Sequence, residues 1–151
     1  MKAMFSGALH ILLADDDEDD RVLFTHALNE LKMDIIVHTV KDGFELMDYL
    51  EKKANDLPQL LFLDLNMPRK NGFECLKEIR SNLKMTEMAI AILSTSLAEK
   101  DIEETFLSGA NVYINKPKNF DDLKSVLNKV VFTVRSYQYA LYDKSNFLLR
   151  V

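Results

Sequence analysis

Short apolar segments alternate five times with helical patterns of apolar residues along this 151-residue chain. The apolar segments, each expected to form a strand, are residues 10–14, 35–40, 60–65, 89–93 and 112–114. The helical patterns that follow them cover residues 18–31, 44–50, 72–80, 101–107 and 123–134. This alternation predicts an α/β domain whose parallel sheet carries helices on both faces. Right-handed crossovers leave few topologies, and we expect a doubly wound five-stranded sheet in the order 2-1-3-4-5 with five helices.

Polar side chains lie at the ends of four of the expected strands. Asp15 and Asp16 follow the first strand, Asp64 closes the third, Ser94 follows the fourth and Lys116 follows the fifth. In the order 2-1-3-4-5 these ends meet at one edge of the sheet, where open α/β sheets bind ligands. Taken alone, Asp64 could equally well be a helix cap or a turn residue with no part in ligand binding. A set of caps would not place three carboxylates, a hydroxyl and an ammonium at these strand ends.

The three carboxylates favour a bound cation. Carboxylates this close repel one another, and one would take up a proton unless a cation offset the repulsion. Oxygen ligands suit Mg²⁺ or Mn²⁺, and the backbone carbonyl of Asn66 can join them, whereas the lack of nearby His or Cys argues against zinc. Asp64 could then attack a phosphoryl group as a nucleophile. The metal and Lys116 would neutralise the transferring oxygens, and Ser94 could donate a hydrogen bond to one of them.

The same residues resemble a known family. Asp15-Asp16, Asp64 with Asn66-Met67-Pro68, Ser94-Thr95 and Lys116-Pro117 are similar to the motifs of the receiver domain of two-component response regulators. The resemblance covers about residues 10–134 and implies the flavodoxin-like fold expected above. It implies that Asp64 accepts a phosphoryl group from a histidine kinase or a histidine phosphotransfer domain. Residues 67–72 and 81–87 resemble stand-alone receivers paired with phytochrome-type or hybrid kinases.

The resemblance also implies the ligands of the metal and the control of hydrolysis. It places Mg²⁺ on Asp16, Asp64 and the carbonyl of Asn66, with Asp15 acting mainly through water. Asn66 and Ser96 would flank the phosphoryl group and gate the attacking water. Because neither is a strong base, we expect no fast general-base route for hydrolysis of the aspartyl phosphate.

A switch follows from the same match. Lys116 falls on the phosphate-binding lysine, and its bond to Pro117 is commonly cis in the family, a form that costs little before proline. Ser94 falls on the switch hydroxyl and Tyr113 on the switch aromatic. A phosphoryl group would draw the Ser94 hydroxyl toward it and let Tyr113 turn inward, changing the face of the fourth helix, fifth strand and fifth helix. Residue 95 is Thr where many receivers have Ala, and we expect its branched side chain to restrict Tyr113 and damp the switch.

The chain is expected to divide into three parts. Residues 1–8 form a tail, residues 9–135 the receiver domain and residues 136–151 an apolar C-terminal extension. The extension is too short for a DNA-binding domain and too apolar to remain in water. It either folds back on the last helix or packs against a second subunit, and we favour a homodimer through this region.

Charge and composition indicate which classes of partner and which cellular location to expect. The formal net charge of −5 argues against nucleic acid as a partner. There is neither a run of about 18 apolar residues nor the layout of a signal peptide, so no membrane association is expected. The single cysteine, Cys75, is interpreted as a packing residue and fits the cytoplasm. Other acids and histidines are interpreted as ordinary solvated or strand residues: Asp17, Asp19, Asp20, His10, His26 and His38.

Three functions compete on this evidence. The first is a single-domain signalling receiver that binds an unidentified partner or relays its phosphoryl group, without turnover of a separate substrate. The second is a metal-dependent phosphatase that forms an aspartyl phosphate. Such enzymes usually need a second Asp two residues after the nucleophile, where this chain has Asn66. The third is a scaffold that has lost phosphorylation, against which the intact Asp16, Asp64 and Lys116 argue.

Overall fold

The computed structural model describes residues 7–136 and 147–149, in which strands and helices alternate as predicted. The strands are β1 (Leu9–Ala14), β2 (Ile35–Val40), β3 (Leu60–Asp64), β4 (Ala89–Ser94), β5 (Val112–Asn115) and β6 (Leu148–Leu149). The α-helices are α1 (Glu18–Asn29), α2 (Gly43–Lys52), α3 (Gly72–Arg80), α4 (Glu99–Leu107) and α5 (Phe120–Arg135). A 3₁₀ turn, η1 (Leu83–Met85), follows α3.

All strands of the sheet run parallel in the order β2-β1-β3-β4-β5-β6. The predicted order is confirmed for its first five strands, and the prediction of five strands is wrong by one. The sixth strand has only two residues, too few for any hydrophobic period to reveal it. It continues the same strand–helix–strand pattern, since β6 returns beside β5 after α5 and lies parallel to it.

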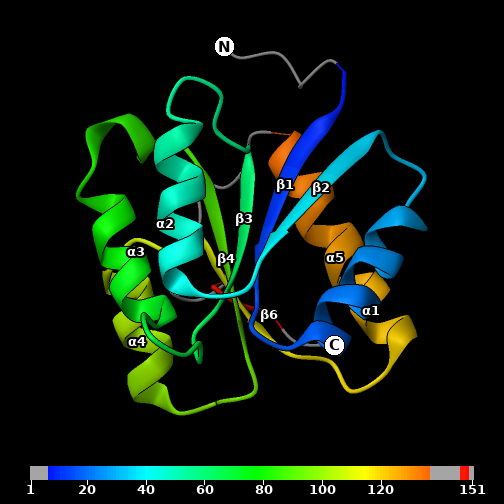
Figure 1. Cartoon of the computed structure of the whole chain (residues 1–151). Helices are drawn as coiled ribbons and strands as arrows, with labels where there is room; N and C mark the ends of the chain where they lie inside the picture. The colour runs from blue at the N-terminus through cyan, green and yellow to red at the C-terminus, as the bar shows by residue number, and fades with distance from the viewer. Residues whose placement is uncertain (1–6, 137–146, 150–151) are drawn as a thin grey trace.

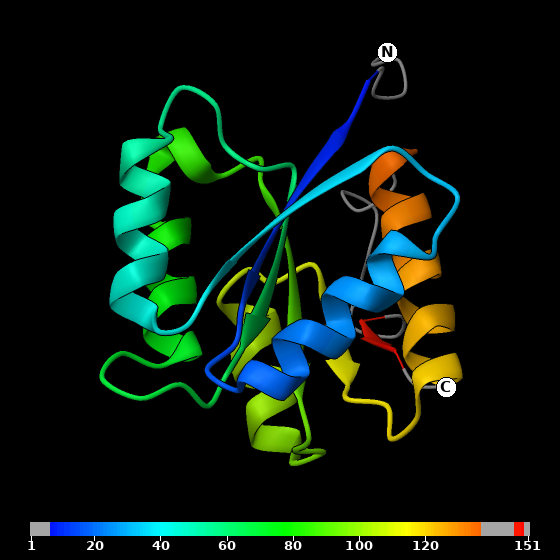
Figure 2. The same cartoon turned by 45° about the vertical axis from the view of Figure 1, so that its right-hand side comes forward.

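Helices cover both faces of the sheet, as Figures 1 and 2 show: α1 and α5 on one face, α2, α3 and α4 on the other. Every residue of β3 and β4 is buried, which explains why their sequences are continuous apolar runs and not alternating ones. Alternate residues of β3 pack against the helices on the two faces of the sheet. Leu60 and Phe62 face α1 and α5, and Leu61 and Leu63 face α2 and α3.

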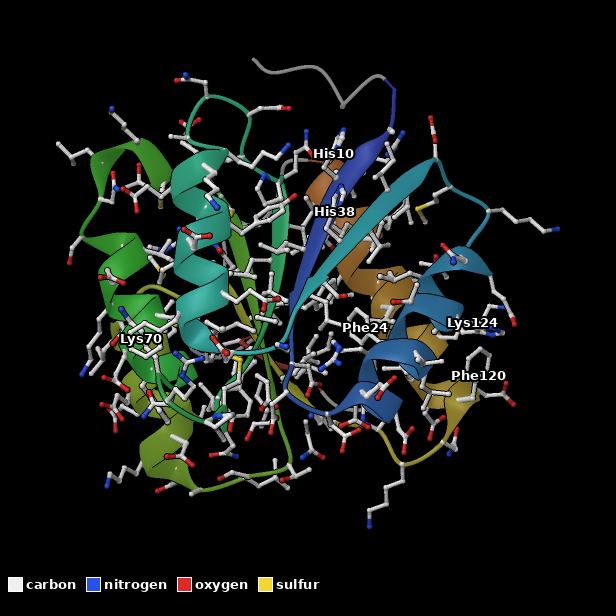
Figure 3. All side chains as sticks on the ribbon, in the orientation of Figure 1. His10, Phe24, His38, Lys70, Phe120 and Lys124 are labelled. Carbon is white, nitrogen blue, oxygen red and sulfur yellow. The ribbon has the colours of Figure 1, made fainter. Side chains whose placement is uncertain are left out.

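The α1–α5 layer is packed through an aromatic pair. Phe24 of α1 points toward the sheet (Figure 3), and its ring meets Phe62 of β3 edge-on with centroids 4.7 Å apart. At the far end of the same layer the Lys124 ammonium of α5 lies 3.2 Å from the Glu30 carboxylate that follows α1. These contacts hold α1 against β3 and α5, next to the loop that carries the acidic pair.

Side-chain caps set where most helices begin. Asp17, Asp42, Asn71 and Asn119 each accept a hydrogen bond from the backbone N–H three residues later, at the starts of α1, α2, α3 and α5. Asp17, assigned to solvent in the sequence, is therefore the cap of α1. Helix α4 differs, because Ala98 at its start offers no side-chain cap. It also begins two residues earlier than the predicted 101–107.

Arg80 ties the end of α3 to the segment before β5. Its guanidinium donates to the carbonyl of Gly109 at 2.8 Å and to the side-chain oxygen of Asn111 at 2.9 Å. It also donates to the carbonyls of Met85 and Thr86 at 3.3 and 3.2 Å. The Asn111 oxygen in turn accepts the Ile90 N–H at 2.8 Å, so one side chain links α3, β4 and β5.

We predict that Arg80→Met lowers the free energy of unfolding by about 2–4 kcal/mol, because four acceptors lose a partly buried, charged donor. Urea unfolding followed by circular dichroism measures the change. The matched control is Lys77→Met on the same helix, whose ammonium lies 3.3 Å from the Glu104 carboxylate at the surface. We expect this control to cost less than about 1 kcal/mol. Equal losses in the two variants would contradict a special role for Arg80.

Candidate functional site

Three carboxylates meet at the carboxyl ends of β1 and β3, as the sequence predicted. Each of Asp15, Asp16 and Asp64 offers an oxygen atom, and these atoms all lie within 4.8 Å of one another. Asp15 and Asp64 are buried, at 2% and 4% exposure, whereas Asp16 is exposed. A set of oxygen ligands with one open side fits Mg²⁺ or Mn²⁺ with water in the remaining positions.

Backbone groups hold the two buried acids in place. The Asn66 N–H donates to Asp64 Oδ1 at 3.1 Å, and the Asp17 N–H donates to Asp15 Oδ1 at 3.0 Å. Helix α3 starts so close to Asp64 that a Cβ atom added to Gly72 would lie 2.4 Å from the Asp64 carbonyl oxygen. Only glycine allows this close approach. The Asp64 backbone thus lies against the start of α3, and its side chain is held by the Asn66 N–H of its own turn.

Lys116 contributes a positive charge that contacts the same acids. Its ammonium is 3.2 Å from Asp15 Oδ2 and 3.6 Å from Asp64 Oδ2, and its backbone N–H donates to the Ser94 carbonyl at 2.8 Å. Burial by itself would lower the pKa of Lys116, but the Asp64, Asp15 and Asp20 carboxylates outweigh burial and raise that pKa. The amine is therefore a permanent positive charge in the site.

Asp20 is a residue that the sequence interpretation missed. It was assigned to solvent with the other acids of the helix start, yet its Oδ2 lies 3.2 Å from the Lys116 ammonium. Its position in the first turn of α1, on the turn nearest the acidic pair, was the available signal. Asp17 instead caps the helix, and Asp19 is exposed.

Asp64 is poised to change its charge. Burial raises the pKa of Asp64 from its ordinary 3.8 to about 7, although the Lys116 ammonium and the Asn66 N–H act to lower it. The Asp15 carboxylate adds to the rise. A divalent cation beside these oxygens would favour the ionised form, which is the form that can act as a nucleophile.

A chain of hydrogen bonds leads from the site to Tyr113. The Ser96 N–H donates to Ser94 Oγ at 3.0 Å, and the Tyr113 hydroxyl donates to the Ser96 carbonyl at 2.9 Å. Ser96 Oγ also donates to Asp101 Oδ2 at 2.7 Å, which anchors the loop to α4. The Tyr113 ring is completely buried, so it already occupies an inward position, and burial raises its pKa. Thr95 is exposed, and its predicted restriction of Tyr113 stays a prediction.

One predicted feature of the site is wrong. The bond between Lys116 and Pro117 is trans, like every peptide bond in the described residues. The trans form is the favoured isomer even before proline, by about 0.5–1 kcal/mol.

Three residues to which the sequence analysis gave no part in the site, His10, His38 and Cys75, lie elsewhere. His10 and His38 lie on β1 and β2 (Figure 3), and the His38 ring contacts Tyr49 with centroids 5.8 Å apart. Cys75 is buried in α3, where burial raises the pKa of its thiol to about 11, in agreement with a packing residue. None of these side chains reaches the acidic cluster.

Comparison with known proteins identifies the family. Residues 11–128 match the model of the response regulator receiver domain. The chain belongs to this family. Receiver domains are signalling proteins that accept phosphate from histidine kinases, and they bind Mg²⁺ or Mn²⁺ at an aspartate cluster like the one described above. The predicted family and the predicted cation are therefore confirmed.

Individual receivers resemble the chain over most of their length. The response regulator Rcp1 of Synechocystis sp. is 32% identical over 117 residues, which are 75% of this chain and 80% of Rcp1. The crystal structure of phosphorylated RcpA, a cyanobacterial phytochrome response regulator, is 34% identical with a TM-score of 0.79, over 87% of this chain and 96% of RcpA. The Mn²⁺-bound form of Rcp1 is 30% identical with a TM-score of 0.71, over 89% of this chain and 96% of Rcp1.

Within the described residues no helix has the length and apolar character needed to cross a membrane.

We predict that Mg²⁺ binding to this receiver domain strengthens as the pH rises. The protonated Asp64 carboxyl cannot bind the ion, so the apparent affinity should rise by about tenfold per pH unit and level off above about pH 7. Without metal, the stability of the fold should instead fall as the pH rises. The folded pKa of about 7 lies above the ordinary 3.8, so the stability contributed by protonated Asp64 is lost as the pH rises between these values.

Thermal unfolding from pH 5 to pH 8, with and without MgCl₂, measures both effects. Asp64→Asn is the control, because it keeps the shape of the side chain and removes its titration. Stabilisation by Mg²⁺ that is equal at all these pH values would contradict the prediction.

Proposed function

We propose that the chain is a single-domain response regulator that accepts a phosphoryl group from a histidine kinase, or a histidine phosphotransfer domain, onto Asp64. The observation that carries the proposal is the position of the buried Asp64 carboxylate, which clusters with Asp15 and Asp16 and lies 3.6 Å from the Lys116 ammonium. The aspartyl phosphate would be the signalling form. The protein would react once per donor and would not turn over a separate substrate.

Each residue then has a defined part in the transfer. Asp15, Asp16, Asp64 and the carbonyl of Asn66 would hold Mg²⁺ or Mn²⁺, which when bound neutralises charge on the phosphoryl oxygens. The Asn66 N–H occupies Asp64 Oδ1, so Oδ2 is the oxygen left to attack phosphorus. Lys116, 3.6 Å from Oδ2, would bind a phosphoryl oxygen and offset its charge.

A switch would follow from the bonds around Ser96. Once the Ser94 hydroxyl turns to the phosphoryl group, it no longer holds the Ser96 N–H, and the loop that accepts the Tyr113 hydroxyl can move. The change would reach the face formed by α4, β5 and α5, where a downstream partner would bind. Asn66 and Ser96, beside the phosphoryl group, would set its lifetime.

The remaining assignments are proposals of the same kind. We place the tail at residues 1–8, the receiver domain at 9–135 and the extension at 136–151. The similarity extends over 96% of RcpA, which supports a receiver function for this chain. RcpA is described as a phytochrome response regulator, which supports a phytochrome-type or hybrid kinase as the donor. A cytoplasmic location and a homodimer through the last helix and the extension are proposed from composition alone, and a nucleic-acid partner is not expected.

We predict that incubation with Mg²⁺ and phosphoramidate adds one phosphate, seen as a single mass increase of the intact protein. Asp64→Asn should abolish the increase, and chelation of Mg²⁺ should suppress it, because both remove the ionised nucleophile or its counter-charge. Turnover of many equivalents of donor would indicate a phosphatase. No gain of mass in the wild-type protein would indicate a scaffold and would overturn the proposal.

We predict that Asp20→Asn speeds phosphorylation by up to about fivefold. The substitution removes one of three carboxylates that compete for Lys116, and a half-exposed ion pair of this kind is worth up to about 1 kcal/mol. Initial rates with phosphoramidate measure the effect. Asp19→Asn is the matched control, since Asp19 is the exposed neighbour on the same helix turn. A slower rate for Asp20→Asn would mean that Asp20 assists the reaction.

A further inference from the structure

The end of the C-terminal extension lies against the switch tyrosine. Phe147 is completely buried, although it belongs to a segment outside the receiver motifs. Its ring meets Phe106 of α4 edge-on with centroids 5.2 Å apart, and it meets Tyr113 of β5 with centroids 6.2 Å apart. The extension therefore supplies an aromatic ring to the α4–β5 side of the domain.

The backbone of this segment is bound to the same strand. The Tyr113 N–H donates to the Phe147 carbonyl at 2.9 Å, and Leu148 and Leu149 pair with Tyr113 and Ile114. Leu148 packs with the α2–α3 side of the sheet and Leu149 with the α1–α5 side. The strand edge of β5, which would otherwise present unpaired backbone groups, is covered by the protein's own chain over these residues.

Tyr113 thus has contacts in two directions. Its hydroxyl donates to the Ser96 carbonyl, in the loop whose N–H holds Ser94 Oγ. Its ring and its backbone N–H contact Phe147. With Phe147 in place, the ring cannot leave its buried position through the side that Phe147 fills.

We infer that the segment 147–149 is an intramolecular ligand of the α4–β5 surface, and that its docking is coupled to phosphorylation of Asp64 through Tyr113. This inference rests on the proposed function. The docked segment favours the buried Tyr113 that the phosphorylated form requires. Coupling of this kind is reciprocal, so phosphorylation must also tighten the docking. A partner of this face would then contact a surface built partly from the extension.

Hydrogen exchange of the Tyr113 amide tests the inference, because Phe147 supplies the acceptor of that N–H. In the wild-type protein with Mg²⁺, phosphorylation by phosphoramidate should slow this exchange by about fivefold or more, the lower end of ordinary allosteric coupling. In Phe147→Ala the exchange should be faster in both states, and the phosphorylated fraction at limiting donor should fall. Phe132→Ala is the matched control, since Phe132 is 59% exposed on α5, and it should behave like the wild type.

The possible outcomes distinguish a failure of the coupling from a failure of the proposed function. If the wild-type protein gains phosphate on Asp64 but Tyr113 exchange stays the same, the coupling is overturned and the proposed function stands. If no phosphate is gained, the proposed function fails and the coupling fails with it. If Phe147→Ala also loses protection in β1 and β3, the variant is unfolded, and the wild-type comparison decides alone.

Discussion

The structure depends on the burial of a carboxylate at the end of its central strand. Asp64 lies beside Asp15, an arrangement that is unfavourable for two negative charges in a region with little water. Lys116 and the Asn66 N–H offset part of this cost, and a raised pKa for Asp64 reflects the remainder. In the proposed function, positive charge from outside completes the site, first a cation and then the electrophilic phosphorus of a donor. A stable domain thereby acquires a group that reacts.

Much of this arrangement could be predicted from the sequence. Fully apolar strands identify the centre of a parallel sheet, and polar residues directly after them identify the edge where ligands bind. Asp15, Asp16, Asp64 and Lys116 were predicted to meet for this reason, and they do. Helix α3 was predicted with both of its ends, at residues 72 and 80.

Other features carry no signal of that kind. Asp20 reaches Lys116 only because of the direction in which α1 leaves the sheet, which helical periodicity does not determine. Strand β6 has two residues and depends on pairing with β5, a long-range contact that no local pattern encodes. The extension was predicted to be too apolar to remain in water, and a homodimer through it was favoured over folding back on the last helix. Phe147, Leu148 and Leu149 fold back within one chain, and the rest of the extension lies outside the described residues.

The glycine at the start of α3 has a consequence for where the domain can deform. Gly72 brings α3 against the backbone of Asp64, and Arg80 fastens the other end of that helix to its neighbours, so α3 is anchored at both ends. Helix α4 lacks a side-chain cap at Ala98 and is joined to the loop before it through Ser96. A disturbance that begins at the strand ends will therefore be resisted on the α3 side and relieved on the α4 side. We therefore expect α3 to keep its position while α4 moves, and the lack of a side chain at Gly72 contributes to this difference.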